Sequence, residues 1–222
     1  MQNNNNNNNI EKLQEEGPKY GYYLQLEKCY CIVHPAYVAE ANKMFSKMAV
    51  QVVTGFKYVG GFIGTEQDTN IWLTDKVEKW VNSINCLSKA AETYPHSAYT
   101  VLTKSLQLEW TYKIVSGAEF FFIPVKEALI NTFLPKMSSL DLTFEKKSLM
   151  CKPVRYVGMG IDDPIFDAPL AFETSRESTK MMIEAITSGD TIDMDAYEQE
   201  NSNKKVQAKK NKNSKTQKFK KQ

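Results

Sequence analysis

The sequence predicts an α+β fold, in which a small mixed or antiparallel sheet precedes a mostly helical region and both ends of the chain are disordered. Short segments rich in Val, Ile, Tyr and Phe, separated by glycines, fill much of the first 64 residues. From residue 65 onward, apolar residues recur at three- and four-residue intervals, as on the buried face of a helix. An asparagine run at residues 3–9 and a lysine-rich tail from residue 204 offer few apolar side chains to bury.

Two strands and two helical segments are expected before residue 50. Residues 10–16 have the pattern of the last turns of a helix, which the following Gly-Pro pair stops. Residues 22–26 and 28–33 are predicted to be strands, and the first of them would leave an unpaired sheet edge. Pro35 suits the first turn of a helix, and residues 36–48 carry apolar side chains at helical spacing.

A glycine-rich hairpin is expected next. Residues 51–54 and 56–63 are rich in Val, Phe, Tyr and Ile on either side of Gly55. Further glycines at positions 60, 61 and 64 stand where a hairpin needs a tight turn or a close approach of two backbones.

Four helices are expected after the hairpin. Each stripe of apolar residues ends at a helix breaker, which is Pro95, Gly117, Pro135 or Gly189. The tryptophans of the first two helices lie on these stripes, which favours a place in the core over base stacking. The predicted bounds of the helices are residues 65–94, 97–115, 124–135 and 168–188.

The charge of the chain is unevenly distributed. Residues 204–222 hold nine of the 28 basic residues and none of the 26 acidic ones, so residues 1–203 carry a formal charge of −7. Nucleic-acid-binding surfaces are usually basic, because phosphate contacts supply most of the non-specific affinity. The body is therefore a poor candidate for strong unaided duplex binding, whereas the tail has the composition of a solvated basic arm.

No secretory signal and no apolar run of about 18 residues is visible, so neither export nor membrane insertion is predicted. The four cysteines show no spacing typical of a disulfide framework. We therefore expect reduced thiols and an intracellular protein, nuclear or cytoplasmic, rather than a secreted one.

Several segments together resemble the C-terminal end of the palm and the thumb of retroelement reverse transcriptases. The Lys-bearing strand, helix and strand before a Tyr-x-Gly-Gly-Phe-Ile-Gly hairpin resemble the approach to the primer grip. The PVKEALINTFLP, KPVRYVGMGIDDP and AFETS segments resemble the region after the thumb. The resemblance covers residues 11–189, and its thumb pattern rests on Pro95, Ala98, Tyr99, Ser105, Leu106, Gln107, Glu109 and Trp110.

The resemblance implies a domain order along the chain. Residues 10–64 would be the palm end with its primer-grip-like hairpin, residues 65–135 a helical thumb-like domain, and residues 136–190 a post-thumb region. Residues 1–9 and 191–222 would be disordered, the latter being basic from residue 204.

The resemblance also implies candidate binding residues and the absence of a catalytic centre. Polymerases of this family bind Mg²⁺ through aspartates that precede the matching region, and no such motif stands before Gly17. No cofactor and no catalytic residue is therefore expected in this chain, unless an upstream exon supplies the aspartates. The hairpin would support a primer end, or instead pack on the next helix through Trp72. The primer-grip-like residues are Phe56, Tyr58, Gly60, Gly61 and Phe62, and the candidate phosphate contacts are Lys28, Lys76, Lys104, Lys204, Lys205, Lys209 and Lys210.

Neither of two possible metal sites is predicted. Asp162 and Asp163 are adjacent carboxylates, but a following proline favours a turn that they cap or solubilise. Cys29, Cys31 and His34 would need a fourth ligand to hold zinc, and thiols in a strand are more often small core residues.

Two functions remain open on the sequence alone. The chain is either a remnant of a retroelement RNA-directed DNA polymerase that is inactive on its own, or a non-enzymatic module that binds RNA or DNA through its scaffold and lysine tail.

Overall fold

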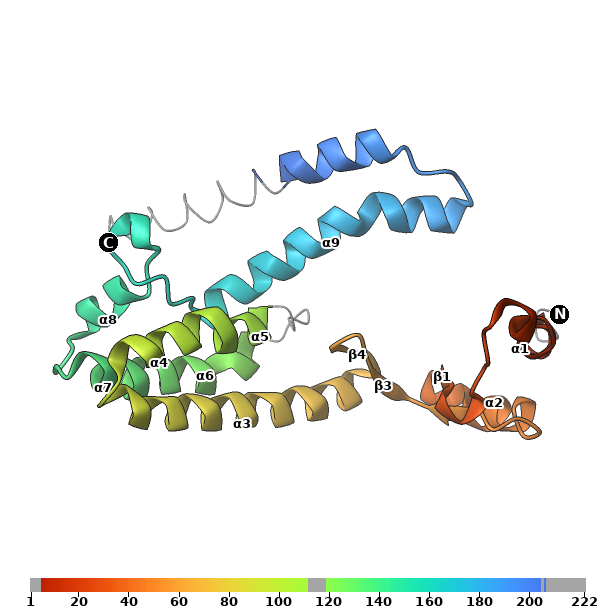
Figure 1. Ribbon diagram of the computed structural model, residues 1–222, viewed down its shortest axis with the longest axis horizontal. Coiled ribbons are helices and arrows are strands. Elements are labelled where there is room, and N and C mark those ends of the chain that lie inside the picture. Colours follow the sequence, from red (N-terminus) through yellow and green to blue (C-terminus); the bar gives the residue numbers. More distant parts are fainter. Residues whose placement is uncertain (1–4, 112–118, 205, 207–222) are drawn as a thin grey trace. The chain divides into compact units, whose positions relative to one another are not determined.

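The computed structural model describes residues 5–111, 119–204 and 206. The chain divides into two compact units, Met1–Leu73 and Thr74–Gln222, which we call the N-terminal and the C-terminal unit (Figure 1). Helices dominate the described residues and the strands are short, which confirms the broad α+β class.

The N-terminal unit opens with helix α1, Asn5–Glu16, which ends in a 3-10 turn at Gly17–Tyr20. The predicted helix end is thus confirmed, and Gly21 closes it with a φ of 77°. The asparagine run differs from its prediction, because Asn5 and the residues after it are helical. Extending an existing helix by one residue costs far less free energy than starting a new helix. The helix at residues 10–16 can therefore extend into the asparagine run.

Two separate pairs of strands make up the β-structure. Strand β1, Tyr30–Ile32, runs parallel to β2, Gln51–Val53, and β3, Gly55–Tyr58, runs antiparallel to β4, Gly61–Gly64. The predicted strand at residues 28–33 is confirmed, although β1 is shorter. The predicted hairpin is present, but both of its strands lie within residues 55–64, and residues 51–53 pair with β1 instead. Between β1 and β2 lie a 3-10 turn at Pro35–Tyr37 and helix α2, Val38–Met44, which is shorter than predicted.

The prediction of a strand at residues 22–26 is wrong. The structure shows no strand there, and Leu26–Lys28 is a 3-10 turn. The carbonyls of Gln25 and Leu26 accept hydrogen bonds from Lys28 and Cys29, so these backbone groups are satisfied locally rather than across a sheet.

Helix α3, Glu66–Ala91, begins in the N-terminal unit and continues into the C-terminal one. Two further helical stretches each contain a π-helical segment, a rare wider turn that occurs mostly as a bulge within an α-helix. The first stretch comprises α4, Pro95–Val101, the π segment Leu102–Leu106 and α5, Gln107–Thr111; the second comprises α6, Ile123–Glu127, the π segment Ala128–Phe133 and α7, Leu134–Ser138.

The predicted end at Pro135 is wrong, because this proline lies inside α7. A proline has no N–H to donate to the carbonyl four residues earlier in an α-helix. The π segment just before Pro135 replaces the α-helical hydrogen bonds by bonds between residues five apart, which changes the pattern at this position. The predicted end of the second helix near Gly117 lies outside the described residues.

The C-terminal unit ends in α8, Phe144–Met150, α9, Pro164–Ser188, and a helical segment at residues 194–204. The end of α9 at Gly189 is confirmed, whereas the helix at residues 194–204 replaces predicted disorder. Contacts of Lys204 stabilise the end of that helix. Its Nζ lies 2.6 Å from the Glu200 carboxylate and donates a hydrogen bond to the Glu177 carbonyl on α9 at 2.8 Å.

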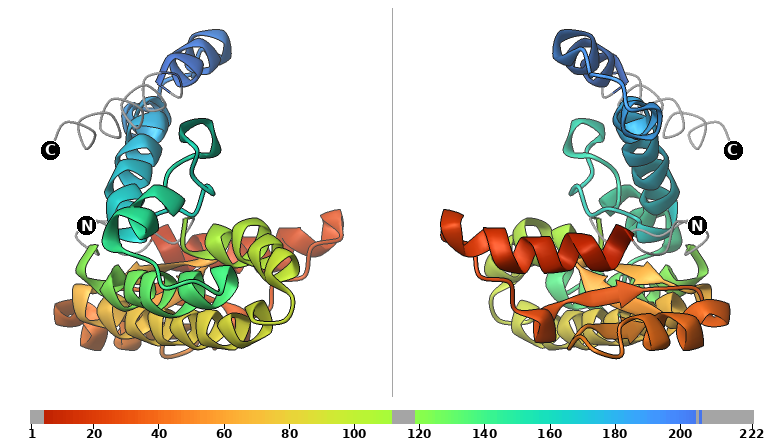
Figure 2. Two further views of the ribbon diagram at one scale, coloured as in Figure 1. Left: turned by 90° about the vertical axis from the view of Figure 1, so that its left-hand side faces the viewer. Right: turned by 90° about the vertical axis from the view of Figure 1, so that its right-hand side faces the viewer.

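The core of the C-terminal unit contains a cluster of aromatic side chains. Trp80 of α3 is 2% exposed, meets Trp110 of α5 edge to face, and stacks on Phe122 at a centroid distance of 6.1 Å. Helix α9 packs against α5 and α6, and α4 packs against α7, as the two side views in Figure 2 show. The sequence prediction that Trp80 and Trp110 belong to the core is confirmed.

Candidate nucleic-acid-binding hairpin

The β3–β4 hairpin closes in a two-residue turn at Val59 and Gly60, whose φ angles are 47° and 81°. Such a turn needs positive φ at both positions, which glycine adopts freely and valine does not. Val59 is 87% exposed, so neither burial nor packing compensates for its strained backbone. Strained residues held on exposed turns are often found at binding sites.

The base of the hairpin is tied to the first turn of α3. Thr65 precedes the helix, and its hydroxyl accepts from the Asp68 N–H at 3.2 Å. The Asp68 carboxylate accepts from the hydroxyls of Thr65 at 2.7 Å and Thr54 at 2.8 Å. These two bonds, that of Thr65 first, lower the pKa of Asp68 and keep it ionised where the hairpin meets the helix.

One face of the hairpin packs inward. Phe62 stacks on Trp72 of α3, with ring centroids 5.6 Å apart. Its ring also covers Gly55, where an added Cβ would lie 2.7 Å from it. Packing through Trp72, one of the two interpretations that the sequence left open, is therefore present in the structure.

The other face of the hairpin is largely open. Cross-strand register places Phe56 with Ile63 and Tyr58 with Gly61 on this face. Phe56 stacks on Tyr30 of β1 with ring centroids 3.7 Å apart, while Tyr58 and Ile63 are 61% and 51% exposed. An aromatic stack beside an exposed tyrosine is a surface on which nucleic-acid bases can stack.

The five primer-grip-like residues share one hairpin but not one surface. Phe56, Tyr58, Gly60 and Gly61 lie on the open face or the turn, whereas Phe62 faces α3. The sequence prediction missed Val59, Tyr30 and Ile63. Strand alternation could have found Ile63, because it stands two positions beyond Gly61 and hence on the same face.

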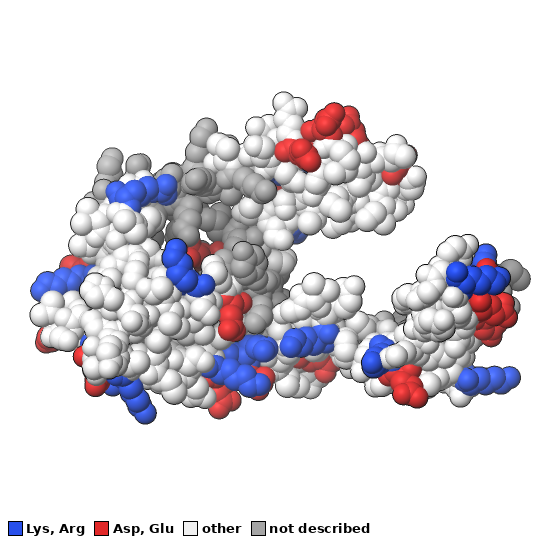
Figure 3. All heavy atoms as spheres, in the orientation of Figure 1, with Lys and Arg blue, Asp and Glu red and all other residues white. Residues whose placement is uncertain are grey.

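The candidate lysines are divided between the two units. Lys28 is exposed in the N-terminal unit, and Lys104 is exposed in the C-terminal unit. Lys76 is half-buried, and Lys204 is held by Glu200 and the Glu177 carbonyl. Lys205, Lys209 and Lys210 lie outside the described residues. Figure 3 shows basic and acidic side chains interspersed on the visible face.

The two adjacent aspartates have structural partners. Asp163 caps α9 by accepting from the Ile165 N–H at 3.1 Å and pairs with Lys126 at 2.6 Å. Asp162 exchanges hydrogen bonds with the side chain of Gln107, accepting at 2.8 Å and donating its N–H at 3.2 Å. The sequence predicts a turn here; the structure shows instead the start of helix α9, which Asp163 caps.

No group of three His, Cys, Asp or Glu side chains that could hold a metal ion occurs within the described part of the chain. The Cys29 thiol donates to the Gln25 carbonyl at 3.4 Å, and His34 Nδ1 accepts from the Ala36 N–H at 3.3 Å. Burial raises the pKa of Cys31, so this thiol stays protonated at neutral pH.

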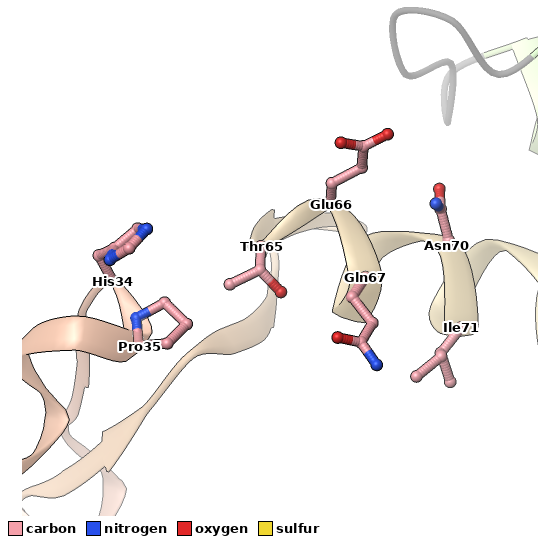
Figure 4. A pocket seen from close by; sticks show the side chains of 7 residues that line it. All are labelled: His34, Pro35, Thr65, Glu66, Gln67, Asn70 and Ile71. Carbon is pink, nitrogen blue, oxygen red and sulfur yellow. The ribbon is translucent and has the colours of Figure 1, made fainter.

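A shallow pocket lies between His34–Pro35 and the first turns of α3 (Figure 4). Glu66 and Asn70 point away on one side of the helix, while Gln67 and Ile71 point away on the other. The side chains therefore diverge and do not converge on a bound molecule. The open hairpin face remains the better candidate site.

No family model, no curated protein and no solved structure matches this chain. None of the helices within the described residues is both long enough and apolar enough to cross a membrane.

Proposed function

We propose that the chain is a nucleic-acid-binding unit of the palm-end and thumb kind found in retroelement reverse transcriptases. In this proposal the β3–β4 hairpin supports one strand of RNA or DNA, and the 222-residue chain does not add nucleotides by itself. The observation that carries the proposal is the geometry of the hairpin. Asp68 anchors its base to α3, and Tyr58 and the strained turn at Val59 are exposed to solvent.

The order of elements supports the same proposal. Strand, helix, strand and glycine hairpin are followed by a long helix and a helical unit with an aromatic core. The resembling polymerases place a primer-supporting hairpin in front of their thumb in this order. The expected role is positioning, because the adjacent Asp162 and Asp163 are committed to Gln107, Lys126 and the start of α9.

The charge distribution favours a second candidate, in which the lysine tail alone provides non-specific affinity. Residues 205–222 carry eight lysines and no acidic residue, whereas the rest of the chain is acidic overall. Tail-driven binding would be independent of sequence and would fall steeply with salt.

A truncation after Val206 separates the two candidates and keeps the Lys204 contact with α9. Binding of a labelled primer–template by the full and truncated chains is measured by fluorescence anisotropy at 50 and 200 mM salt. We expect the truncated chain to retain binding that Tyr58→Ala weakens by about 1–3 kcal/mol. Loss of all binding on truncation would instead assign it to the tail. With Mg²⁺ and nucleotides we expect no primer extension, and extension above a heat-killed control would refute the non-catalytic part of the proposal.

A further inference from the structure

Many large apolar side chains of the N-terminal unit are exposed to solvent. Its buried apolar residues, among those described, are Ala41, Phe45 and Leu73, whereas eleven of its large apolar side chains are exposed. The C-terminal unit contributes the other 17 of the 20 buried apolar side chains. Large apolar side chains in solvent are candidates for contact with a partner, and strand β1 carries two of them, Tyr30 and Ile32.

Strand β1 offers a specific point of attachment. The Cys29 C=O and the Val33 N–H bond to β2, each at 3.0 Å. Backbone groups of successive strand residues point to opposite edges, so those of Tyr30 and Ile32 point away from β2. No described residue hydrogen-bonds to them, and β1 and β2 form a two-stranded sheet.

This edge also lacks the usual protection. Natural proteins cover exposed edges or interrupt them with charges, prolines or bulges. The sequence from Cys29 to Val33 contains no charged residue and no proline, and Tyr30 and Ile32 are 38% and 36% exposed. A two-stranded parallel sheet with an open, uncharged edge is rare, because parallel sheets are normally covered.

We propose that the occupant of this edge is a second copy of the chain, with the two β1 strands antiparallel about a twofold axis at Cys31. In this register Tyr30 of each copy faces Ile32 of the other, so both outward-facing residues of each strand find hydrogen-bonding partners. Aromatic residues opposite β-branched residues are favourable cross-strand pairs. Residues 29–33 contain no charged side chain, so pairing two copies of this edge brings no like charges together there.

The register predicts a short distance between the two Cys31 residues. They would form a non-hydrogen-bonded pair with Cα atoms about 4.5 Å apart. That spacing lies within the range that a disulfide bridges. Cys86 provides a control, because it is an exposed thiol on α3 in the C-terminal unit.

The first test is the mass of the full-length chain in solution. Sedimentation velocity over 1–100 μM is expected to show a species of twice the 25.4 kDa chain mass. Ile32→Lys places a charge on the edge and should raise the dimer dissociation constant at least tenfold. Ile71→Lys makes the same change on an exposed α3 residue of the same unit and should leave the constant unchanged. A wild-type monomer at 100 μM, or equal effects of both variants, would overturn the proposal.

The second test places the interface. Copper–phenanthroline accepts the two electrons that are released when two thiols join, and it is expected to yield a disulfide-linked dimer on a non-reducing gel. Cys31→Ser should remove this band, while Cys86→Ser should keep it. A dimer band that persists in Cys31→Ser and disappears in Cys86→Ser would place the contact elsewhere and refute the β1 register.

Discussion

Replacing Gly64 by alanine is expected to disrupt the hairpin and lower nucleic-acid affinity by at least as much as the loss of one stacked base. An added Cβ at position 64 would lie 2.4 Å from the Gly55 Cα and 2.8 Å from the Thr54 carbonyl oxygen. Both are backbone atoms, so the two strands must separate at the base of the hairpin. Base stacking contributes about 1–3 kcal/mol, which is about fivefold to more than a hundredfold in affinity. Fluorescence anisotropy with the labelled primer–template measures the change.

Gly61→Ala is the matched control for this variant. The same substitution on the same strand meets only the Tyr58 carbonyl oxygen at 3.6 Å, which is an ordinary contact. We expect Gly61→Ala, whose added methyl group lies on the open face, to keep the fold of the hairpin and to lose less affinity than Gly64→Ala. If Gly64→Ala binds as tightly as Gly61→Ala, the geometry of the hairpin does not determine binding.

Replacing Trp80 by alanine is expected to destabilise the C-terminal unit by about 3–5 kcal/mol, the usual cost of removing a buried aromatic side chain. Trp80 is 2% exposed, contacts two other aromatic rings, and donates its Nε1–H to Glu109 at 3.1 Å. The variant therefore loses packing on both rings and leaves a carboxylate without this donor. Urea unfolding followed by far-ultraviolet circular dichroism measures the effect.

Ile186→Ala serves as its control, because this side chain on α9 is 76% exposed. Substitutions of exposed residues usually change stability by less than about 0.5 kcal/mol. A Trp80→Ala variant as stable as Ile186→Ala would contradict the aromatic core described for this unit.

Local patterns predicted the hairpin and the longest helices well. Alternating aromatic and β-branched residues around Gly55 and Gly60 are sufficient to place β3 and β4, since both depend on nearby residues. The apolar stripe through Trp80 likewise predicts α3 within three residues at either end, because a long amphipathic pattern leaves little ambiguity.

Features that depend on distant partners were not predictable. The absence of a strand at residues 22–26 follows from the lack of a neighbouring strand, which no local pattern reveals. The helix at residues 194–204 includes Lys204, whose partners lie on α9 and on its own turn. The inward orientation of Phe62 likewise depends on Trp72, ten residues away. Tertiary contacts, or their absence at residues 22–26, therefore override the local composition in each case.

The most direct test of the central claim is photo-crosslinking from the hairpin to a nucleic-acid end. A benzophenone amino acid replaces Tyr58 in the full chain, and a second variant carries it at the exposed Ile186 of α9. With a primer–template labelled on the primer, we predict that position 58 crosslinks to the last few nucleotides of the primer and that position 186 does not. Absence of crosslinks from position 58, or crosslinks spread evenly along the duplex, would contradict a strand-supporting role for the β3–β4 hairpin.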